Sequence, residues 1–233
     1  MDGAEGAAGS DRSAAPRIRD LPAPRENPSV TAPLFRTVFA WPYRLVLAGL
    51  LKAGFRAWHL TLLSLAANVV VGVLLLSGRR LLPGLLLLPA GLFDIFDGAV
   101  ARHRGEESRK GALLDSVSDR ACEGIVFGCL FFSLAWQNNE IDSALALASM
   151  IVSLLVSHLR AEGEAAGLRM SEGTFQRLER YIALVIGLCV PGALRPALAL
   201  LTGLGALTAL QRARGAWRGI GTSSEPSLPS DRD

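Results

Sequence analysis

Residues 94–119 read DIFDGAVARHRGEESRKGALLDSVSD, a short polar loop between two apolar segments. Four aspartates lie in this stretch: Asp94, Asp97, Asp115 and Asp119. An ionised aspartate at membrane depth costs at least ~2.5 kcal/mol, so four of them require a compensating charge. On helices, Asp94 shares a face with Asp97, and Asp115 shares a face with Asp119. If the two segments are antiparallel helices, we expect Asp97 to lie near Asp115 and Asp94 near Asp119.

A divalent metal ion is the compensating charge that this arrangement favours. Carboxylate oxygens suit Mg²⁺ or Mn²⁺, and two ions about 3.5 to 4 Å apart would suit phosphoryl-type transfer. Gly98 and Gly111 fit this site, because a missing side chain lets a nucleotide or a neighbouring helix approach the backbone. Structural ion pairs are the alternative, but the basic residues nearby are too few and too concentrated in the loop to neutralise four carboxylates: Arg102, Arg109, Lys110 and Arg120.

The spacing of the motif carries a resemblance to a known family. The string Asp94-x2-Asp97-Gly98-x2-Ala101-Arg102-x8-Gly111-x3-Asp115-x3-Asp119 resembles the signature of the CDP-alcohol phosphotransferases. Members of that family displace CMP from a CDP-linked alcohol, usually CDP-diacylglycerol, by attack of an acceptor hydroxyl. The resemblance implies that the four aspartates bind the metal and that Asp119 is also the general base. It further implies these contacts with CDP-diacylglycerol: Trp58, His59, Leu60, Thr61, Gly98, Arg102 and Ser108.

Three C-terminal stretches resemble the phosphatidylinositol phosphate synthase branch of the family: Ser157–Arg169, Arg177–Arg180 and Gln211–Arg212. In that branch, basic residues at such positions bind the phosphate of inositol 1-phosphate, a task that suits guanidinium groups. The resemblance implies these phosphate ligands: Arg160, Arg177, Arg212 and, as a second choice, Arg180. Glu162 departs from the branch, where a basic residue is usual. It must face away, pair with an arginine or bind hydroxyls of a different headgroup, so glycerol 3-phosphate or another alcohol stays open as the acceptor.

Composition and hydropathy predict an all-α integral membrane protein. Of the 233 residues, 50% are hydrophobic and only 19% are charged. An interfacial amphipathic helix is expected at 34–53 and precedes six spans, each near the ~20 residues that a bilayer requires. The predicted spans are 59–77, 82–101, 111–136, 142–159, 174–190 and 195–213. Residues 34–220 would form the membrane domain, between disordered tails at 1–33 and 221–233.

Basic residues predict the orientation in the cell membrane, because Lys and Arg accumulate on the cytoplasmic side. With both termini inside, fifteen basic residues would flank the spans on the cytoplasmic side, against three on the other: Arg79, Arg80 and Arg195. We therefore expect a multi-pass protein whose carboxylate cluster and termini face the cytoplasm.

The expected partners are CDP-diacylglycerol, inositol 1-phosphate and membrane lipids, with no nucleic acid. Family resemblance implies a homodimer, for which Gly187 and Gly203 would permit helix contact. A remote alternative is a non-catalytic ion-coupled carrier, which would distribute its acidic residues along the depth of the membrane. The aspartates instead gather at one end of one predicted helical hairpin, which favours the enzyme.

Overall fold

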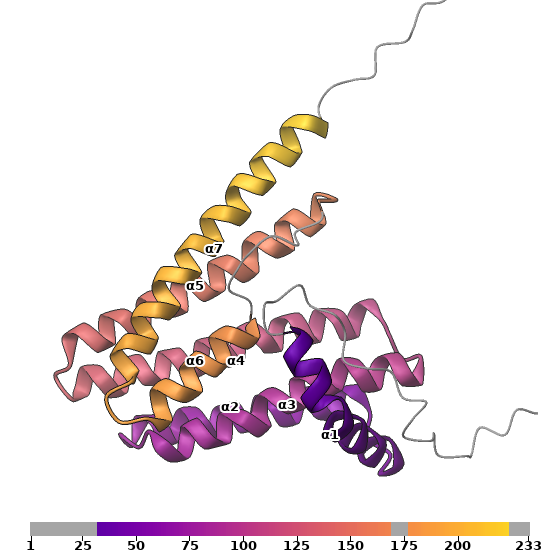
Figure 1. The fold of residues 1–233 in the computed structure, drawn as a ribbon, viewed down its shortest axis with the longest axis horizontal. Helices are drawn as coiled ribbons and strands as arrows, with labels where there is room; N and C mark the ends of the chain where they lie inside the picture. Colours follow the sequence, from indigo (N-terminus) through magenta and orange to yellow (C-terminus); the bar gives the residue numbers. More distant parts are fainter. Residues whose placement is uncertain (1–31, 169–176, 224–233) are drawn as a thin grey trace, which may run out of the picture. The chain divides into compact units, whose positions relative to one another are not determined.

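The computed structural model describes the backbone of residues 32–168 and 177–223 and the side chains of 41–168 and 179–218. These residues form seven α-helices and no strand, which confirms the predicted all-α class. The helices are α1 (Ala32–Lys52), α2 (Ala57–Leu76), α3 (Leu81–Arg104), α4 (Arg109–Trp136), α5 (Glu140–Ala165), α6 (Arg177–Cys189) and α7 (Leu194–Ser223) (Figure 1). Of the predicted tails, residues 1–31 and 224–233 lie outside the described part.

Helix α1 belongs to a first unit, Met1–Arg56, which is distinct from the unit formed by the remaining helices. It occupies the range predicted for the interfacial helix and contains Pro42 in its interior. Gly54 ends it with φ of 80°, and the amide of Phe55 donates to the carbonyl of Leu50 at 3.1 Å. A left-handed glycine with this hydrogen bond is a common way for a helix to end.

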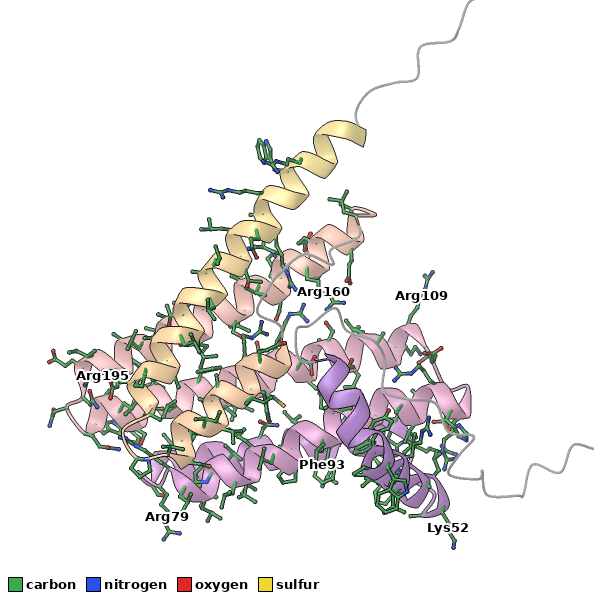
Figure 2. All side chains as sticks on the ribbon, in the orientation of Figure 1. Lys52, Arg79, Phe93, Arg109, Arg160 and Arg195 are labelled. Atoms are coloured by element: carbon green, nitrogen blue, oxygen red, sulfur yellow. The ribbon has the colours of Figure 1, made fainter. Side chains whose placement is uncertain are left out.

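The second unit, Ala57–Asp233, contains α2 to α7. Helix α2 packs against both α3 and α4, while α4 packs against α5, α5 against α7, and α6 against α3 and α7. Both legs of the hairpin, α3 and α4, therefore pack on α2. Figure 2 shows Arg79 and Arg195 at the left end of this unit and Arg109 at its opposite end. The loops of the predicted non-cytoplasmic side therefore share one end.

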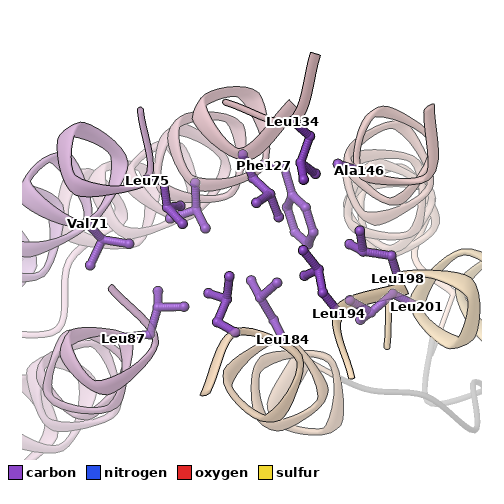
Figure 3. Packing of buried hydrophobic residues seen from close by; sticks show 13 residues of the cluster. Val71, Leu75, Leu87, Phe127, Leu134, Ala146, Leu184, Leu194, Leu198 and Leu201 are labelled. Atoms are coloured by element: carbon purple, nitrogen blue, oxygen red, sulfur yellow. The ribbon is translucent and has the colours of Figure 1, made fainter. Parts of the chain in front are cut away.

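Buried hydrophobic side chains from all six helices form the core of the second unit. Figure 3 shows how they interdigitate, with these residues labelled: Val71, Leu75, Leu87, Phe127, Leu134, Ala146, Leu184, Leu194, Leu198 and Leu201. Small residues allow close helix crossings around this core. A Cβ on Gly187 would lie 2.7 Å from that of Ala197, so Gly187 serves the packing of α6 on α7 within the chain. It is therefore not available for the dimer contact suggested by the sequence.

Among the described residues, four helices are long and apolar enough to cross a membrane, namely α2, α3, α5 and α7. Many large apolar side chains on the outer faces of the second unit are exposed, including Val73, Leu85 and Ile186. Exposed apolar surface of this extent is typical of contact with lipid or with another protein. Helices α6 and α7 are separate, because the turn between them contains Gly192 with φ of 78°. Four membrane-length apolar helices indicate a membrane protein.

Candidate active site

The loop between α3 and α4 is short because strong capping signals lie at both its ends. Gly105, with φ of 64°, ends α3, and its amide donates to the carbonyl of Arg102. Ser108 begins α4 by accepting a hydrogen bond from the amide of Gly111 at 3.0 Å. A serine N-cap and a left-handed glycine C-cap fix both helix ends. The motif aspartates therefore project from two well-defined antiparallel helix ends.

Three of the four motif aspartates converge. One carboxylate oxygen each from Asp94, Asp97 and Asp115 lies within 4.8 Å of the others. Asp97 is buried, and the other two are half-buried. Asp119 is outside this group, although its charge still acts on Asp97. Like charges this close repel each other unless a cation lies among them. Hard oxygen donors at this spacing fit a Mg²⁺ or Mn²⁺ ion.

A hydroxyl group from α2 fixes the most buried of these carboxylates. Thr61 Oγ1 donates a hydrogen bond to Asp97 Oδ2 at 2.7 Å in the interior. One turn further along α2, Ser64 Oγ donates to the carbonyl of Ala90 on α3 at 3.0 Å. Sequence reasoning assigned Thr61 to the nucleotide and missed this bond to Asp97. The available signal was helical periodicity, because Thr61, Ser64 and Asn68 form a polar stripe on an otherwise apolar helix.

The other residues expected to contact CDP-diacylglycerol lie in varied surroundings. Leu60 is fully buried, so it has no exposed surface for a ligand in this structure. Trp58 is about half exposed, and its ring lies 3.9 Å from that of His59, centroid to centroid. A Cβ on Gly98 would meet only the guanidinium of its own helix neighbour Arg102, at 3.2 Å. Gly98 therefore keeps open the surface beside the exposed Arg102.

The predicted phosphate-binding arginines form a second charged group. Arg180 and Arg212 are buried, and Arg212 Nη1 donates to the carbonyl of Val156 on α5 at 2.8 Å. The charge of Arg212 interacts with those of Arg160 and Arg180, and with that of Glu164. Arg160, which lies near the middle of the view in Figure 2, is exposed and pairs with Glu164 at 2.8 Å. The side chain of Arg177 lies outside the described residues. Arg180, the second choice on sequence, is thus one of the two buried members.

Glu162 does not lie among the buried arginines. Its side chain is 68% exposed and lies 3.9 Å from His158 Nδ1. On α5, the carboxylate that pairs with an arginine of this group is that of Glu164, whose partner is Arg160. The departure from the branch pattern at Glu162 therefore places no negative charge against Arg180 or Arg212.

Sequence reasoning also missed Glu123 on α4. Arg180 Nη2 donates to Glu123 Oε1 at 3.1 Å, and both side chains are largely buried. Glu123 follows Asp119 by four residues, so it continues the helical face that carries Asp115 and Asp119. This position on the aspartate face of α4 was the sequence signal that could have identified Glu123. This ion pair joins the carboxylate group to the arginine group.

Comparisons with known proteins identify the family to which this chain is related. Residues 56–210 match the family model of CDP-alcohol phosphatidyltransferase. The phosphatidylinositol phosphate synthase of Mycobacterium marinum is 33% identical over 208 residues, which cover 84% of this chain and 89% of that protein.

Solved structures of the Mycobacterium tuberculosis phosphatidylinositol phosphate synthase also superpose on this chain. The crystal structure with CDP-DAG bound has a TM-score of 0.70 at 30% identity and covers 78% of this chain and 97% of that one. The crystal structure in complex with manganese and citrate has a TM-score of 0.70 at 30% identity, with coverage of 81% and 95%. The chain belongs to the CDP-alcohol phosphatidyltransferase family.

Proposed function

We propose that this protein transfers the phosphatidyl group of CDP-diacylglycerol to inositol 1-phosphate, which yields phosphatidylinositol phosphate and CMP. The observation that carries the choice of acceptor is the arginine group. Arg180 and Arg212 are both buried, and the charge of Arg212 interacts with those of Arg180 and Arg160. Glu123 and Glu164 offset two of these three positive charges, and a phosphate dianion would complement the positive charge that remains. The names of the similar mycobacterial proteins support the same acceptor.

The reaction forms one bond and breaks one bond at the phosphorus nearer the lipid. The acceptor hydroxyl oxygen bonds to this phosphorus while the bond to the oxygen of the CMP phosphate breaks. We assign Asp119 as the general base that takes the hydroxyl proton, because the other three motif carboxylates already converge on one point. CMP leaves with the electron pair of the broken bond, so charge and atoms balance.

Asp94, Asp97, Asp115 and Asp119 are the proposed ligands of two Mg²⁺ or Mn²⁺ ions. When bound, such ions polarise the diphosphate and stabilise the leaving group. Thr61 holds the carboxylate of Asp97 in place for this role. Arg102 and the open surface at Gly98 would receive the cytidine diphosphate, together with Trp58, His59 and Ser108.

The proposed topology is one membrane domain, 34–220, with an interfacial α1 and six spans. Helix α4 has 28 residues, or roughly 42 Å at the usual helical rise, which exceeds the hydrocarbon core. The span proposed for α6 starts at Thr174, and its first residues lie outside the described part. We place both termini and the carboxylates in the cytoplasm, as the distribution of basic residues favours. We also propose a homodimer.

One assay tests the function. Purified protein in detergent receives CDP-diacylglycerol with Mg²⁺ or Mn²⁺, and CMP release is measured with inositol 1-phosphate, free inositol and glycerol 3-phosphate side by side. We expect metal-dependent release with inositol 1-phosphate and little with the other two acceptors. Preferred use of glycerol 3-phosphate would overturn the acceptor while leaving the reaction class intact.

A further inference from the structure

Glu123 lies between the two charged groups of the site. It is one helical turn beyond Asp119 on the same face of α4, and it reaches Arg180 on α6 at 3.1 Å. Side chains of α4 and α6 also share the buried core, in which Phe127 and Leu130 lie with Leu184 and Leu188. Glu123 and Arg180 continue this contact between the two helices as an ion pair. An acceptor with its hydroxyl at Asp119 and its phosphate at the arginines would lie beside Glu123.

Only one of the two carboxylate oxygens of Glu123 has a hydrogen-bond partner among the described residues. Oε1 accepts from Arg180, whereas Oε2 is buried and has no hydrogen-bond partner among the described residues. The side chains of Arg180 and Glu123 are only 10% and 16% exposed. An ionised carboxylate accepts hydrogen bonds at both oxygens, and leaving one of them buried without a donor is unfavourable. A ligand that brings a hydroxyl group would satisfy it.

We infer that Glu123 determines acceptor specificity: Oε2 accepts a hydrogen bond from a second hydroxyl of a phosphorylated polyol, while Oε1 holds Arg180 toward the phosphate. The inference rests on the proposed function, and it adds to that function the group that recognises the polyol. A phosphorylated alcohol without a hydroxyl at this position would leave Oε2 buried and without a donor. Sites that bind a substrate hydroxyl reject analogues that lack it for this reason.

The test compares acceptors that differ by one hydroxyl. The full chain is assayed with CDP-diacylglycerol, the metal ion and either inositol 1-phosphate or each of its monodeoxy analogues. For the wild-type protein, we expect kcat/KM to fall by at least about tenfold for one of the analogues. In Glu123→Ala this discrimination should shrink to within about twofold, and the KM for CDP-diacylglycerol should not change. A merely structural role would lower turnover of every acceptor by the same factor.

Two further variants keep the test decisive. Glu123→Gln preserves size and retains a neutral acceptor oxygen, so its discrimination should lie between those of the wild type and Glu123→Ala. If Glu123→Ala does not fold, Glu123→Gln takes its place in the comparison. Glu162→Gln removes an exposed carboxylate and should discriminate as the wild type does.

Unchanged discrimination in the folded Glu123 variants, with an active wild type, overturns this inference alone. A wild type that uses glycerol 3-phosphate instead overturns the proposed acceptor. The role of Glu123 is then measured with glycerol 3-phosphate and its 2-deoxy analogue.

Discussion

Two of the acid–arginine pairs in the six-helix unit differ in how completely the protein satisfies them. In the first pair, Asp142 Oδ1 accepts from Arg195 at 2.5 Å and Oδ2 accepts from Asn139 at 2.6 Å. In the second pair, Glu123 uses one oxygen for Arg180, and its other oxygen has no partner among the described residues. The Asp142 pair is complete by itself and ties the start of α5 to the start of α7. The Glu123 pair, next to the carboxylates and the arginines, requires a further group.

This difference indicates that the Asp142 pair maintains the fold, whereas the Glu123 pair belongs to a site that binds a ligand. Changes around Asp119, Arg212 and Thr61 should therefore lower activity in proteins that remain folded. Changes at Asp142 should lower stability in proteins whose catalytic constants are normal. Natural proteins commonly show this division, because binding sites retain charges that are favourable only when the ligand is present.

The largest expected effect is that of Asp119→Asn. Loss of the general base should lower kcat for CMP release by about 10²- to 10⁴-fold. The melting temperature should not fall, because the substitution removes a negative charge that acts on Asp97. Turnover and thermal unfolding of the same preparation check both statements. Wild-type turnover in this variant would show that another group takes the proton.

Arg212→Gln should have the next largest effect. We expect the KM for inositol 1-phosphate to rise by about 10- to 100-fold, the equivalent of one hydrogen bond to a charged group. The KM for CDP-diacylglycerol should stay within about twofold of the wild-type value. Arg214→Gln on the same helix is the matched control, because Arg214 is exposed. Equal effects of the two substitutions would argue for a general role of positive charge and against a defined pocket.

Thr61→Val tests the support of Asp97 from α2. The metal concentration that gives half-maximal activity should rise by about tenfold, since outer partners of metal ligands commonly have effects of this size. The increase in melting temperature produced by Mn²⁺ should require correspondingly more metal. Thr61→Ser keeps the hydroxyl and should behave as the wild type. If serine fails to restore metal affinity, packing of the threonine methyl group is the more important contribution.

Asp142→Asn should have the smallest effect, and only on stability. Arg195 is 55% exposed, so solvent screens the pair, and the loss should be about 1 kcal/mol. That corresponds to a decrease of roughly 2–4 °C in melting temperature for a chain of this size. The kcat and KM values of the folded protein should be unchanged. A change in acceptor KM here would contradict the separation of the two pairs.

The parts of the site that local sequence determines were predictable. The α3–α4 hairpin follows from apolar periodicity, the glycine and serine caps, and the spacing of the aspartates. Convergence of Asp94, Asp97 and Asp115 follows from antiparallel helices. The bond between Thr61 and Asp97 was not predictable from spacing, because it joins residues 36 positions apart. The same is true of Glu123 and Arg180, which are 57 positions apart.

Such long-range contacts depend on how the helices rotate and pack, which no single segment determines. Sequence resemblance placed Arg160 ahead of Arg180, yet Arg160 is exposed and Arg180 is buried. Resemblance identifies which positions carry charge. Burial and pairing, which decide how strongly each charge can act, come from tertiary structure.

The packing of both α3 and α4 on α2 has a mechanical consequence. The separation of the two aspartate pairs depends on the surface of α2, so it can be altered from residues that are far from any ligand. Gly72 is such a position, because a Cβ there would lie 2.8 Å from Ile125 Cγ2 and 2.9 Å from Cys129 Sγ. A larger residue at 72 would require Ile125 and Cys129 to shift, and a shift of α4 would change the distance between the metal ligands. Helix α2 therefore sets the distance between the metal ligands on α3 and α4. Substitution of its small residues would change that distance.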